Sequence, residues 1–515
     1  MTQFINNISD VFEEIDILFE SSKIEGKLGD LPIPDSTFGI LHFKAKSIDI
    51  SRKSQDFVFN VDNSGSMSDS CSDGRNKMQH IIYTLKNMIH YFNDNPSISA
   101  NITIFTFNDT ISKIVDRTCI TSENISEIVS MIDKIRPVSS TNIEDALKNT
   151  KEYIAELKQL YPGNEISHIF MTDGDSTSGS NDHAVLKQHI DRSVLNAFIG
   201  FGIEHDACLL NSIGGDTNCS YHFIDKLETS GFVYGEILHG ILYKYLKNVC
   251  LAISDGLIYN YKSNLWTDKL VIGDIIGESN KTYHIISMNP SNCIITITGT
   301  RETEIEYNTL VFFDDNDNEE NKELSKYIFR QRTLQLLFDV NEFENEKHIK
   351  KSNNNDDLNL NLNFNNDDDE LSIKEDELKH KLRDFIIEIK KYMSENHLVN
   401  DNFFKNLCDD VYISYRTIGS KYGKMYTSAR QTSQGTQRCY TVTHTPTSTL
   451  RHSIPRRHVN RNITSNFDFD NDDLFHEVSS FSNTPYSTPQ ATQVMRAVSG
   501  NIWDYNENDN DTQEL

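Results

Sequence analysis

The strongest constraint on the fold is the alternation of strand-like and helix-like segments between residues 56 and 250. Residues 56–62, DFVFNVD, form an apolar run that is typical of a central strand buried on both faces. Residues 76–92 then place apolar side chains at steps of three and four, which predicts a helix with one apolar face. Strands that alternate with helices in this way predict an α/β fold built on a doubly wound, mostly parallel sheet with helices on both faces.

The same alternation continues through the rest of this region. Further strands are predicted at residues 101–107, 111–116, 166–172, 194–201 and 221–224. Helices are predicted at residues 76–92, 123–135, 143–160 and 234–249, with shorter helices between the later strands. In a sheet of this kind, ligands bind beyond the carboxyl ends of the strands.

Oxygen-bearing side chains follow three of these segments in loops that share one edge of the predicted sheet. The first strand ends in the D-x-S-x-S sequence of Asp62, Ser64 and Ser66, in which Gly65 permits a tight turn that aims both hydroxyls at one point. Thr141 lies in SSTNIEDAL, and Asp173 lies in IFMTDGD. Hard oxygen donors of this type suit Mg²⁺, with Mn²⁺ and Ca²⁺ as alternatives.

The combination of D-x-S-x-S, a threonine in T-N-I-x-x-A-L and T-D-G after a β-run resembles the metal-ion-dependent adhesion site (MIDAS) of von Willebrand factor type A (VWA) domains. Every family position is matched. The resemblance implies that Ser64, Ser66 and Thr141 contact the metal directly. It implies that Asp62 and Asp173 act directly or through water, and that one coordination position stays open for a carboxylate of a partner protein. The pentapeptide alone would equally fit a turn with a helix N-cap, but the other two residues and the element order favour the metal site.

The remaining sequence divides the 515-residue chain, which is too long for one core, into further units. Short β-runs without helices between them predict a small antiparallel unit, and the strand-like residues 38–50 are hypothesised to join it. Helical periodicity returns after this unit and is interrupted by an Asn- and Asp-rich stretch. The expected units are an N-terminal flank with a strand at 1–55, the VWA-like domain at 56–250, a β-rich unit at 251–316, a helical segment at 317–410 with a disordered linker at 351–370, and a basic, then polar low-complexity tail at 411–515. This C-terminal tail is expected to be disordered, and to have no core of its own from about Lys424.

Residues 411–466 contain no Asp or Glu, and their basic residues are interleaved with tyrosines. Such a segment could bind an acidic protein surface or nucleic acid, or it could pair within the chain with the acidic remainder; the sequence favours neither. A net charge of −27 argues against general nucleic-acid binding. The basic residues are Arg416, Lys421, Lys424, Arg430, Arg438, Arg451, Arg456, Arg457 and Arg461.

The N-terminus lacks a basic region and a clean apolar region, so we do not expect a signal peptide. No apolar run approaches the roughly 20 residues that a membrane span requires. The eight cysteines are scattered without a C-x-x-C pair, which favours reduced thiols over a zinc site or a redox motif. These features predict an intracellular protein that is not secreted.

The function expected from these patterns is an intracellular protein-interaction module in which the metal bridges to an exposed Asp or Glu of a partner. In the resembled family the last helix, here 234–249, moves together with the metal loops. We expect no enzyme activity, because Asp69, Asp175 and His183, the nearest candidates for a general base, are explained more simply by loop solvation. The alternatives are a non-catalytic subunit or adaptor of a larger enzyme complex and a structural or virion component.

The amino-acid composition of the chain is rich in Asn and Ile, with runs of acidic residues and of Asn. It resembles the composition of proteins from AT-rich genomes, such as those of amoebae and the giant viruses that infect them. This similarity bears on source more than on mechanism. The sequence does not identify the partner, the physiological metal, the oligomeric state or the role of the tail.

Overall fold

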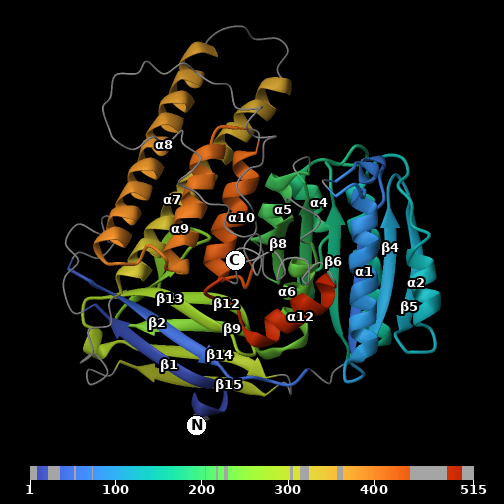
Figure 1. Cartoon of the computed structure of the whole chain (residues 1–515), viewed down its shortest axis with the longest axis horizontal. Helices are drawn as coiled ribbons and strands as arrows, with labels where there is room; N and C mark the ends of the chain where they lie inside the picture. The colour runs from blue at the N-terminus through green and yellow to red at the C-terminus, as the bar shows by residue number, and fades with distance from the viewer. Residues whose placement is uncertain are drawn as a thin grey trace, which may run out of the picture.

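The computed structural model describes residues 8–20, 35–50, 54–71, 73–202, 205–215, 218–224, 230–301, 305–313, 324–356, 364–420, 422–440 and 484–500. Figure 1 shows an α/β layer beside a β-sandwich, with a group of helices above the sandwich. None of the helices in these ranges combines the length and apolarity that a membrane span requires.

The α/β layer is a six-stranded sheet in the order β5-β4-β3-β6-β7-β8. Adjacent strands are parallel except for the edge strand β5, which pairs antiparallel with β4. The predicted fold class is therefore confirmed. The strands are β3 (Gln55–Asp62), β4 (Ala100–Phe107), β5 (Ile111–Cys119), β6 (Glu165–Thr172), β7 (Leu195–Phe201) and β8 (Cys219–Ile224).

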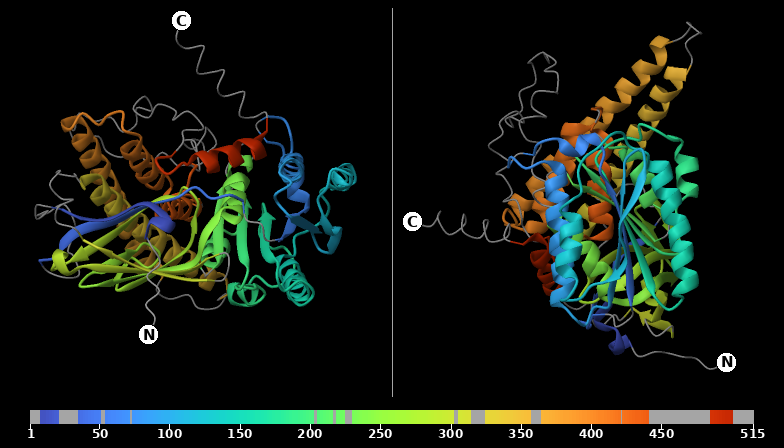
Figure 2. Two further views of the ribbon diagram at one scale, coloured as in Figure 1. Left: turned by 90° about the horizontal axis from the view of Figure 1, so that it is seen from below. Right: turned by 90° about the vertical axis from the view of Figure 1, so that its right-hand side faces the viewer.

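Helices cover both faces of this sheet, and its central strand is therefore buried along its whole length. Phe57 packs against Phe92 of α1 on one face, whereas Val58 shares a core with α3 on the other. Figure 2 (right) shows α1 in blue and α3 in teal on opposite sides of the sheet. The helices are α1 (Lys77–Asp94), α2 (Ile125–Ile132), α3 (Ile143–Leu160), α4 (His183–Gln188), α5 (Ala207–Gly214) and α6 (Ser230–Leu242), with the short 3₁₀ turn η2 at Gly65–Ser68.

The β-sandwich has one sheet in the order β1-β2-β13-β10-β11 and a second in the order β12-β9-β14-β15. Strand β2 pairs with β13, so the N-terminal strand joins the later β-unit as hypothesised. The α/β layer is thus an insertion between β2 and β9. The strands are β1 (Phe12–Phe19), β2 (Thr37–Ala45), β9 (Lys244–Ser254), β10 (Leu257–Asn260), β11 (Leu265–Thr267), β12 (Lys269–Ile276), β13 (Asn280–Ser287), β14 (Ile294–Arg301) and β15 (Glu306–Phe312), with 3₁₀ turns η1 (Ile8–Asp10) and η4 (Pro290–Asn292).

The helix expected at 234–249 differs from the structure, because α6 ends at Leu242 and β9 begins at Lys244. A domain boundary at residue 250 therefore falls inside a strand. The spacing of Leu242, Leu246 and Val249 is the same as on one face of a helix. It arises because the strand contains an irregularity in which Asn248 has a φ of 52°. This irregularity shifts the alternation of buried side chains by one residue.

The helical layer contains α7 (Ser325–Asp356), α8 (Phe364–Glu395), α9 (Asn402–Thr417) and α10 (Gly423–Thr436). Helices α7, α8 and α9 share an apolar core, whereas α10 packs against α7 and α9 and places its buried apolar residues in the core of the α/β layer. The prediction of a disordered linker at 351–370 is wrong at both ends of this range, because the backbone is helical at 351–356 and at 364–370. The polar composition there gives no apolar periodicity, although the helical turns continue from buried Val340 and Phe343. Residues 357–363 lie outside the described residues.

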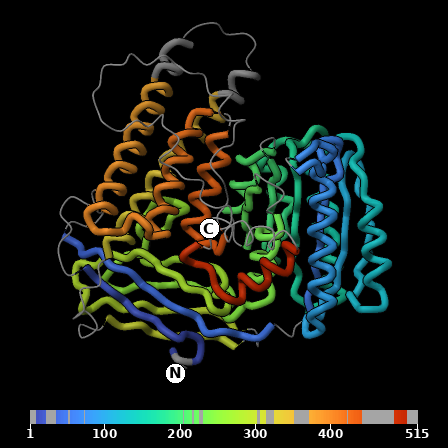
Figure 3. Tube along the Cα trace, in the orientation of Figure 1, coloured from blue at the N-terminus to red at the C-terminus, as the bar shows by residue number. Residues whose placement is uncertain are grey.

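The expectation of a low-complexity tail from residue 411, without a core of its own from about Lys424, is wrong for 411–440 and 484–500. Helices α9 and α10 are largely buried, and α12 (Pro489–Ser499) packs against α6 and α1. Figure 3 shows this C-terminal segment in red beside the α/β layer. The polar composition of these segments predicts the absence of a core. Many of these polar side chains are in fact buried with hydrogen-bond partners, as in the hydrogen bond between Ser428 and Asn341. Residues 441–483 and 501–515 lie outside the described residues.

The basic segment makes internal contacts where the structure describes it. Arg430 binds Asp410 at 3.0 Å, and Arg438 donates to the backbone carbonyl of Tyr221. Lys424 donates to the carbonyl of Asn341. These contacts agree with the hypothesis of pairing within the chain. Lys421 and the basic residues from Arg451 to Arg461 lie outside the described residues.

Candidate metal centre

Asp62 ends the central strand β3 and is completely buried. Its Oδ1 accepts a hydrogen bond from the backbone N–H of Ser64 at 2.8 Å, and its Oδ2 accepts one from the hydroxyl of Thr172 at 2.7 Å. Burial raises the pKa of Asp62 to about 6, and the nearby charge of Asp173 adds to this effect, although hydrogen bonds from Ser64 and Thr172 oppose it. The carboxylate is therefore fixed in position and poorly solvated.

Asp173 follows β6, the parallel neighbour of β3, so both acids lie at the same edge of the sheet. The hydroxyl of Ser66 donates to Asp173 Oδ1 at 2.7 Å. The hydroxyls of Ser64 and Ser66 are 3.1 Å apart. The structure therefore links Asp62, Ser64, Ser66 and Asp173 through a continuous set of hydrogen bonds.

Three loops hold this edge together through their backbones. The N–H of Asn63 donates to the carbonyl of Phe107, and the N–H of Gly65 donates to that of Ser139, both at 2.9 Å. A Cβ atom at Gly65 would lie 3.2 Å from this Ser139 oxygen, so the glycine permits the close approach. The loops after β3 and before α3 are therefore fixed relative to each other.

Thr141 lies in the loop before α3 and is buried. Its carbonyl accepts hydrogen bonds from the N–H groups of Thr177 and Ser178, in the loop that follows Asp173. Thr141 thus lies on a loop bonded to both of the other predicted ligand loops, whereas the other four residues are connected by direct hydrogen bonds through their side chains and the backbone N–H of Ser64. Ligation of a metal by these five residues stays a prediction.

Lys77 is a charged residue of this site that the sequence reasoning missed. Its ammonium lies 2.7 Å from Asp173 Oδ2 and 3.1 Å from Asp69 Oδ2. Burial alone would lower the pKa of Lys77, but the hydrogen bonds and charges of Asp173 and Asp69 outweigh it and raise the pKa. The available signal was a lysine in the first turn of a predicted helix, where the positive end of the helix dipole disfavours a cation.

The residues fit a divalent cation. The predicted set offers two carboxylates and three hydroxyls, which are the hard oxygen donors that Mg²⁺, Mn²⁺ and Ca²⁺ prefer. Asp62 and Asp173 are both completely buried, and two buried carboxylates are unfavourable unless cations or hydrogen-bond donors compensate them. A divalent ion would add positive charge to the compensation that Lys77 and the hydrogen bonds from Ser64, Ser66 and Thr172 already supply.

The residues weighed as candidate general bases have other contacts. His183 binds Asp206 at 2.8 Å, and the carboxylate of Asp206 also caps α5 by accepting from the N–H of Leu209. Asp69 binds Lys77. His183 and Asp69 are therefore explained by ion pairs that fix the surrounding helices.

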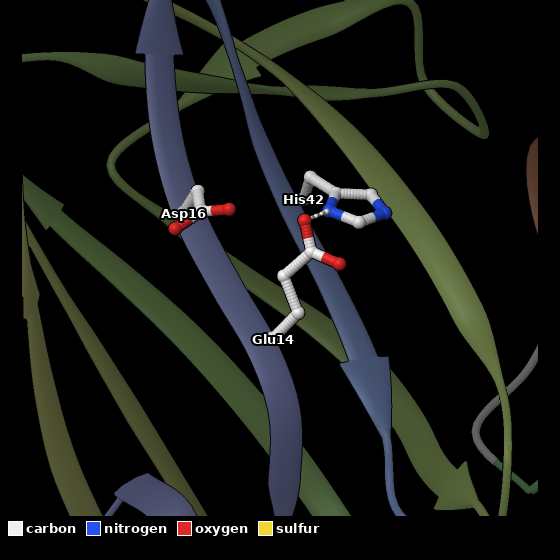
Figure 4. Close-up of side chains that lie close together, drawn as sticks. All are labelled: Glu14, Asp16 and His42. Carbon is white, nitrogen blue, oxygen red and sulfur yellow. Dashed lines mark ion pairs between the residues drawn. The ribbon is translucent and has the colours of Figure 1, made fainter. Parts of the chain in front are cut away.

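A second group of metal-ligating side chains lies on the sandwich, where Glu14 and Asp16 of β1 face His42 of β2. Figure 4 shows Glu14 directed toward the His42 ring. The distance from His42 Nδ1 to Glu14 is 3.9 Å, and His42 Nε2 is 2.8 Å from the side-chain oxygen of Asn280. Glu14 is 53% exposed, so an ordinary surface pair accounts for this group.

Residues 56–233 match the family model of the von Willebrand factor type A domain. The chain contains a VWA domain. Members of this family generally mediate metal-dependent protein–protein interactions. Comparison of the sequence with curated proteins gives no match.

Solved structures give more distant similarities, which cover different shares of the chain. A von Willebrand factor type A protein from Catenulispora acidiphila is 13% identical, with 66% of this chain and 83% of that chain covered at a TM-score of 0.44. The ArnB paralog VWA2 from Sulfolobus acidocaldarius is also 13% identical, with 82% and 99% covered at a TM-score of 0.44. Proximal thread matrix protein 1 from the mussel byssus, with a zinc-occupied MIDAS motif, is 20% identical, with 34% and 43% covered at a TM-score of 0.27.

Proposed function

We propose that the VWA domain of this chain binds a divalent cation, Mg²⁺ in the first place, and uses it to capture a carboxylate of a protein partner without catalysing a reaction. The observation that carries the proposal is the convergence of two completely buried carboxylates on one loop: Asp62 accepts the backbone N–H of Ser64, Asp173 accepts the hydroxyl of Ser66, and the two serine hydroxyls are 3.1 Å apart. Thr141 would complete the ligand set. When bound, the cation would supply a Lewis-acid position for an oxygen of the partner.

The chain's own residues prepare this site. Thr172 and the N–H of Ser64 hold both oxygens of Asp62, and Ser66 orients one oxygen of Asp173. Backbone hydrogen bonds from Asn63 and Gly65 anchor the D-x-S-x-S loop to the neighbouring loops. A preorganised set of oxygens lowers the entropy lost when an ion binds, which favours a binding role.

The test is thermal unfolding of the full chain titrated separately with MgCl₂, MnCl₂ and CaCl₂. A saturating rise in the unfolding temperature is expected, with stabilisation of about 2.7 kcal/mol at 100 times the dissociation constant. The rise should be absent from Asp62→Ala and Asp173→Ala. Asp133→Ala is the matched control, because Asp133 is an exposed acid that pairs with Lys86 on the same domain. No rise in the wild type would contradict the proposal.

An intracellular location is part of the same proposal. All eight cysteines are free thiols in the structure, which suits a reducing compartment. Thiol titration of the protein purified without reductant, and denatured before labelling, should find all eight reactive. Fewer reactive thiols, with disulfides identified by mass spectrometry, would count against this location.

A further inference from the structure

Lys77 occupies an unfavourable position for a lysine. It is the first residue of α1, where the exposed N–H groups and the helix dipole repel a cation. The helix start is already capped by Asn76 and Gln79, each of which accepts a hydrogen bond from the other's backbone N–H. Lys77 is therefore not required to cap the helix, and its ion pairs with Asp173 and Asp69 are what stabilise it there.

The ammonium of Lys77 belongs to the same hydrogen-bonded group as the predicted metal ligands. Asp173 receives the Ser66 hydroxyl on Oδ1 and Lys77 on Oδ2, so both of its oxygens are engaged. The Lys77 side chain is only 15% exposed. Because water is largely excluded from it, its charge is weakly screened and acts on any ion held by Ser66 and Asp173.

The charges of these side chains can be added. Asp62 and Asp173 contribute two negative charges and Lys77 one positive charge, so the site without metal carries a net charge of −1. Asp69 is left out of this sum because it is 62% exposed and its charge is screened by solvent. A divalent cation changes this sum to +1. Without Lys77, the loaded site would be neutral.

We propose that Lys77 determines the specificity of this site by acting as an internal cation that weakens divalent-metal binding and leaves the loaded site with a net positive charge. This charge favours an anionic oxygen ligand, a carboxylate, over a neutral carbonyl or hydroxyl. The inference rests on the proposed function, because it concerns the same metal and the same partner group. It assigns a role to a residue that is outside the D-x-S-x-S, Thr and Asp pattern.

The first test measures Mn²⁺ binding to the full chain by isothermal titration calorimetry. Lys77→Met keeps much of the side-chain length without the charge and should bind Mn²⁺ about tenfold more tightly than the wild type. Lys77→Arg keeps the charge and should stay within about threefold of the wild type. Lys86→Met is the matched control, because it removes a lysine from the same helix that pairs with the exposed Asp133. It should leave the affinity unchanged.

The second test measures the ligand preference of the loaded site. With MnCl₂ at saturation, sodium acetate should raise the unfolding temperature of the wild type above that in sodium chloride of equal ionic strength. The rise should be much smaller in Lys77→Met and should return in Lys77→Arg. Equal acetate responses in the wild type and Lys77→Met would overturn the specificity role.

The outcomes separate this inference from the proposed function. The inference is overturned, and the metal site is retained, if Asp62→Ala abolishes Mn²⁺ binding and Lys77→Met binds Mn²⁺ no more tightly than the wild type does. Binding by Lys77→Met without binding by the wild type supports the inference and overturns the proposed function of the natural chain. If neither protein binds Mn²⁺, both proposals are overturned.

Discussion

Two groups of buried charges in this molecule are built differently. Between α9 and α10, Asp410 binds Arg430 at 3.0 Å through one oxygen and Gln434 at 2.8 Å through the other, so this acid is bonded directly to a cation of its own. At the edge of the α/β sheet, Asp62 and Asp173 share a hydrogen-bonded group with one ammonium, that of Lys77. Asp410 and Arg430 cancel each other's charge as a pair, whereas Asp62 and Asp173 share one cation and leave an excess of negative charge.

This difference separates two uses of buried polar groups. A balanced pair orients the elements that carry it, and its removal from one side leaves an uncompensated charge in the core. An unbalanced group costs stability unless something binds to it, so excess buried charge is a signal of a binding site. The VWA domain and the helical layer should therefore respond differently to the loss of a single polar side chain.

The largest effect is expected from Arg430→Met, which leaves Asp410 buried without its cation. The variant should lose about 3–5 kcal/mol of unfolding free energy, measured by urea denaturation of the full chain. Adding Asp410→Leu should recover most of the loss, because no uncompensated charge remains. A loss below about 1 kcal/mol, the range of an exposed ion pair, would break the distinction between the two groups.

A buried acid without a directly bonded cation should respond to pH. Glu344 of α7 accepts the N–H of Gly419 at 2.7 Å, and burial raises its pKa to about 7. Since the folded pKa lies above the ordinary value, its stabilising contribution is complete below pH 4.5 and is lost as the pH rises through about 7.

Glu344→Gln should therefore be more stable than the wild type at pH 8, by up to about 3 kcal/mol, and similar to it at pH 4. Unfolding free energies measured across this range would show the two curves converging as the pH falls. Parallel curves would show that Glu344 does not titrate in the folded chain.

The apolar contact between α6 and the C-terminal helix α12 provides a reference without charge. A Cβ at Gly235 of α6 would overlap the backbone of Met495 in α12, whereas a Cβ at Gly240 would meet nothing within 4 Å. Gly235→Ala should lose about 1–3 kcal/mol because α12 must shift. Gly240→Ala, on the same helix, should be neutral or gain up to about 1 kcal/mol. Equal thermal stabilities of the two variants would contradict the close packing of α12.

The smallest loss is expected at the metal edge. Ser66→Ala removes the hydroxyl that donates to Asp173, but Lys77 still binds the other oxygen of this acid. The metal-free variant should lose about 1 kcal/mol, while its stabilisation by MgCl₂ should disappear. A loss as large as that of Arg430→Met would mean that this edge serves stability in the same way as the balanced pair.

The sequence predicted the elements whose periodicity is simple. The run from Asp56 to Asp62 is a central strand, and the parallel order of β3 and β6 brings Asp62 and Asp173 to one edge, as the motif spacing required. The helical spacing of Leu242, Leu246 and Val249 was misleading because a strand irregularity produces the same pattern.

Side-chain contacts between distant parts of the chain that no motif or strand pattern marks could not be predicted. Lys77 meets Asp173 across 96 positions, and no local pattern in either segment specifies that pair. The polar residues of α10 appeared to form a tail because their partners, such as Asp410 and Asn341, lie on other helices. Buried polar packing has no periodic signal in a single sequence.

The insertion of the VWA domain between β2 and β9 has a consequence for synthesis of the chain on the ribosome. Strand β2 needs β13 as its neighbour, and Asn280, which bonds His42, lies 238 residues later. At a translation rate of about 5–20 residues per second, β2 waits roughly 10–50 s for this strand. The inserted domain emerges completely during that interval, so it should fold first and bring the two halves of the sandwich together.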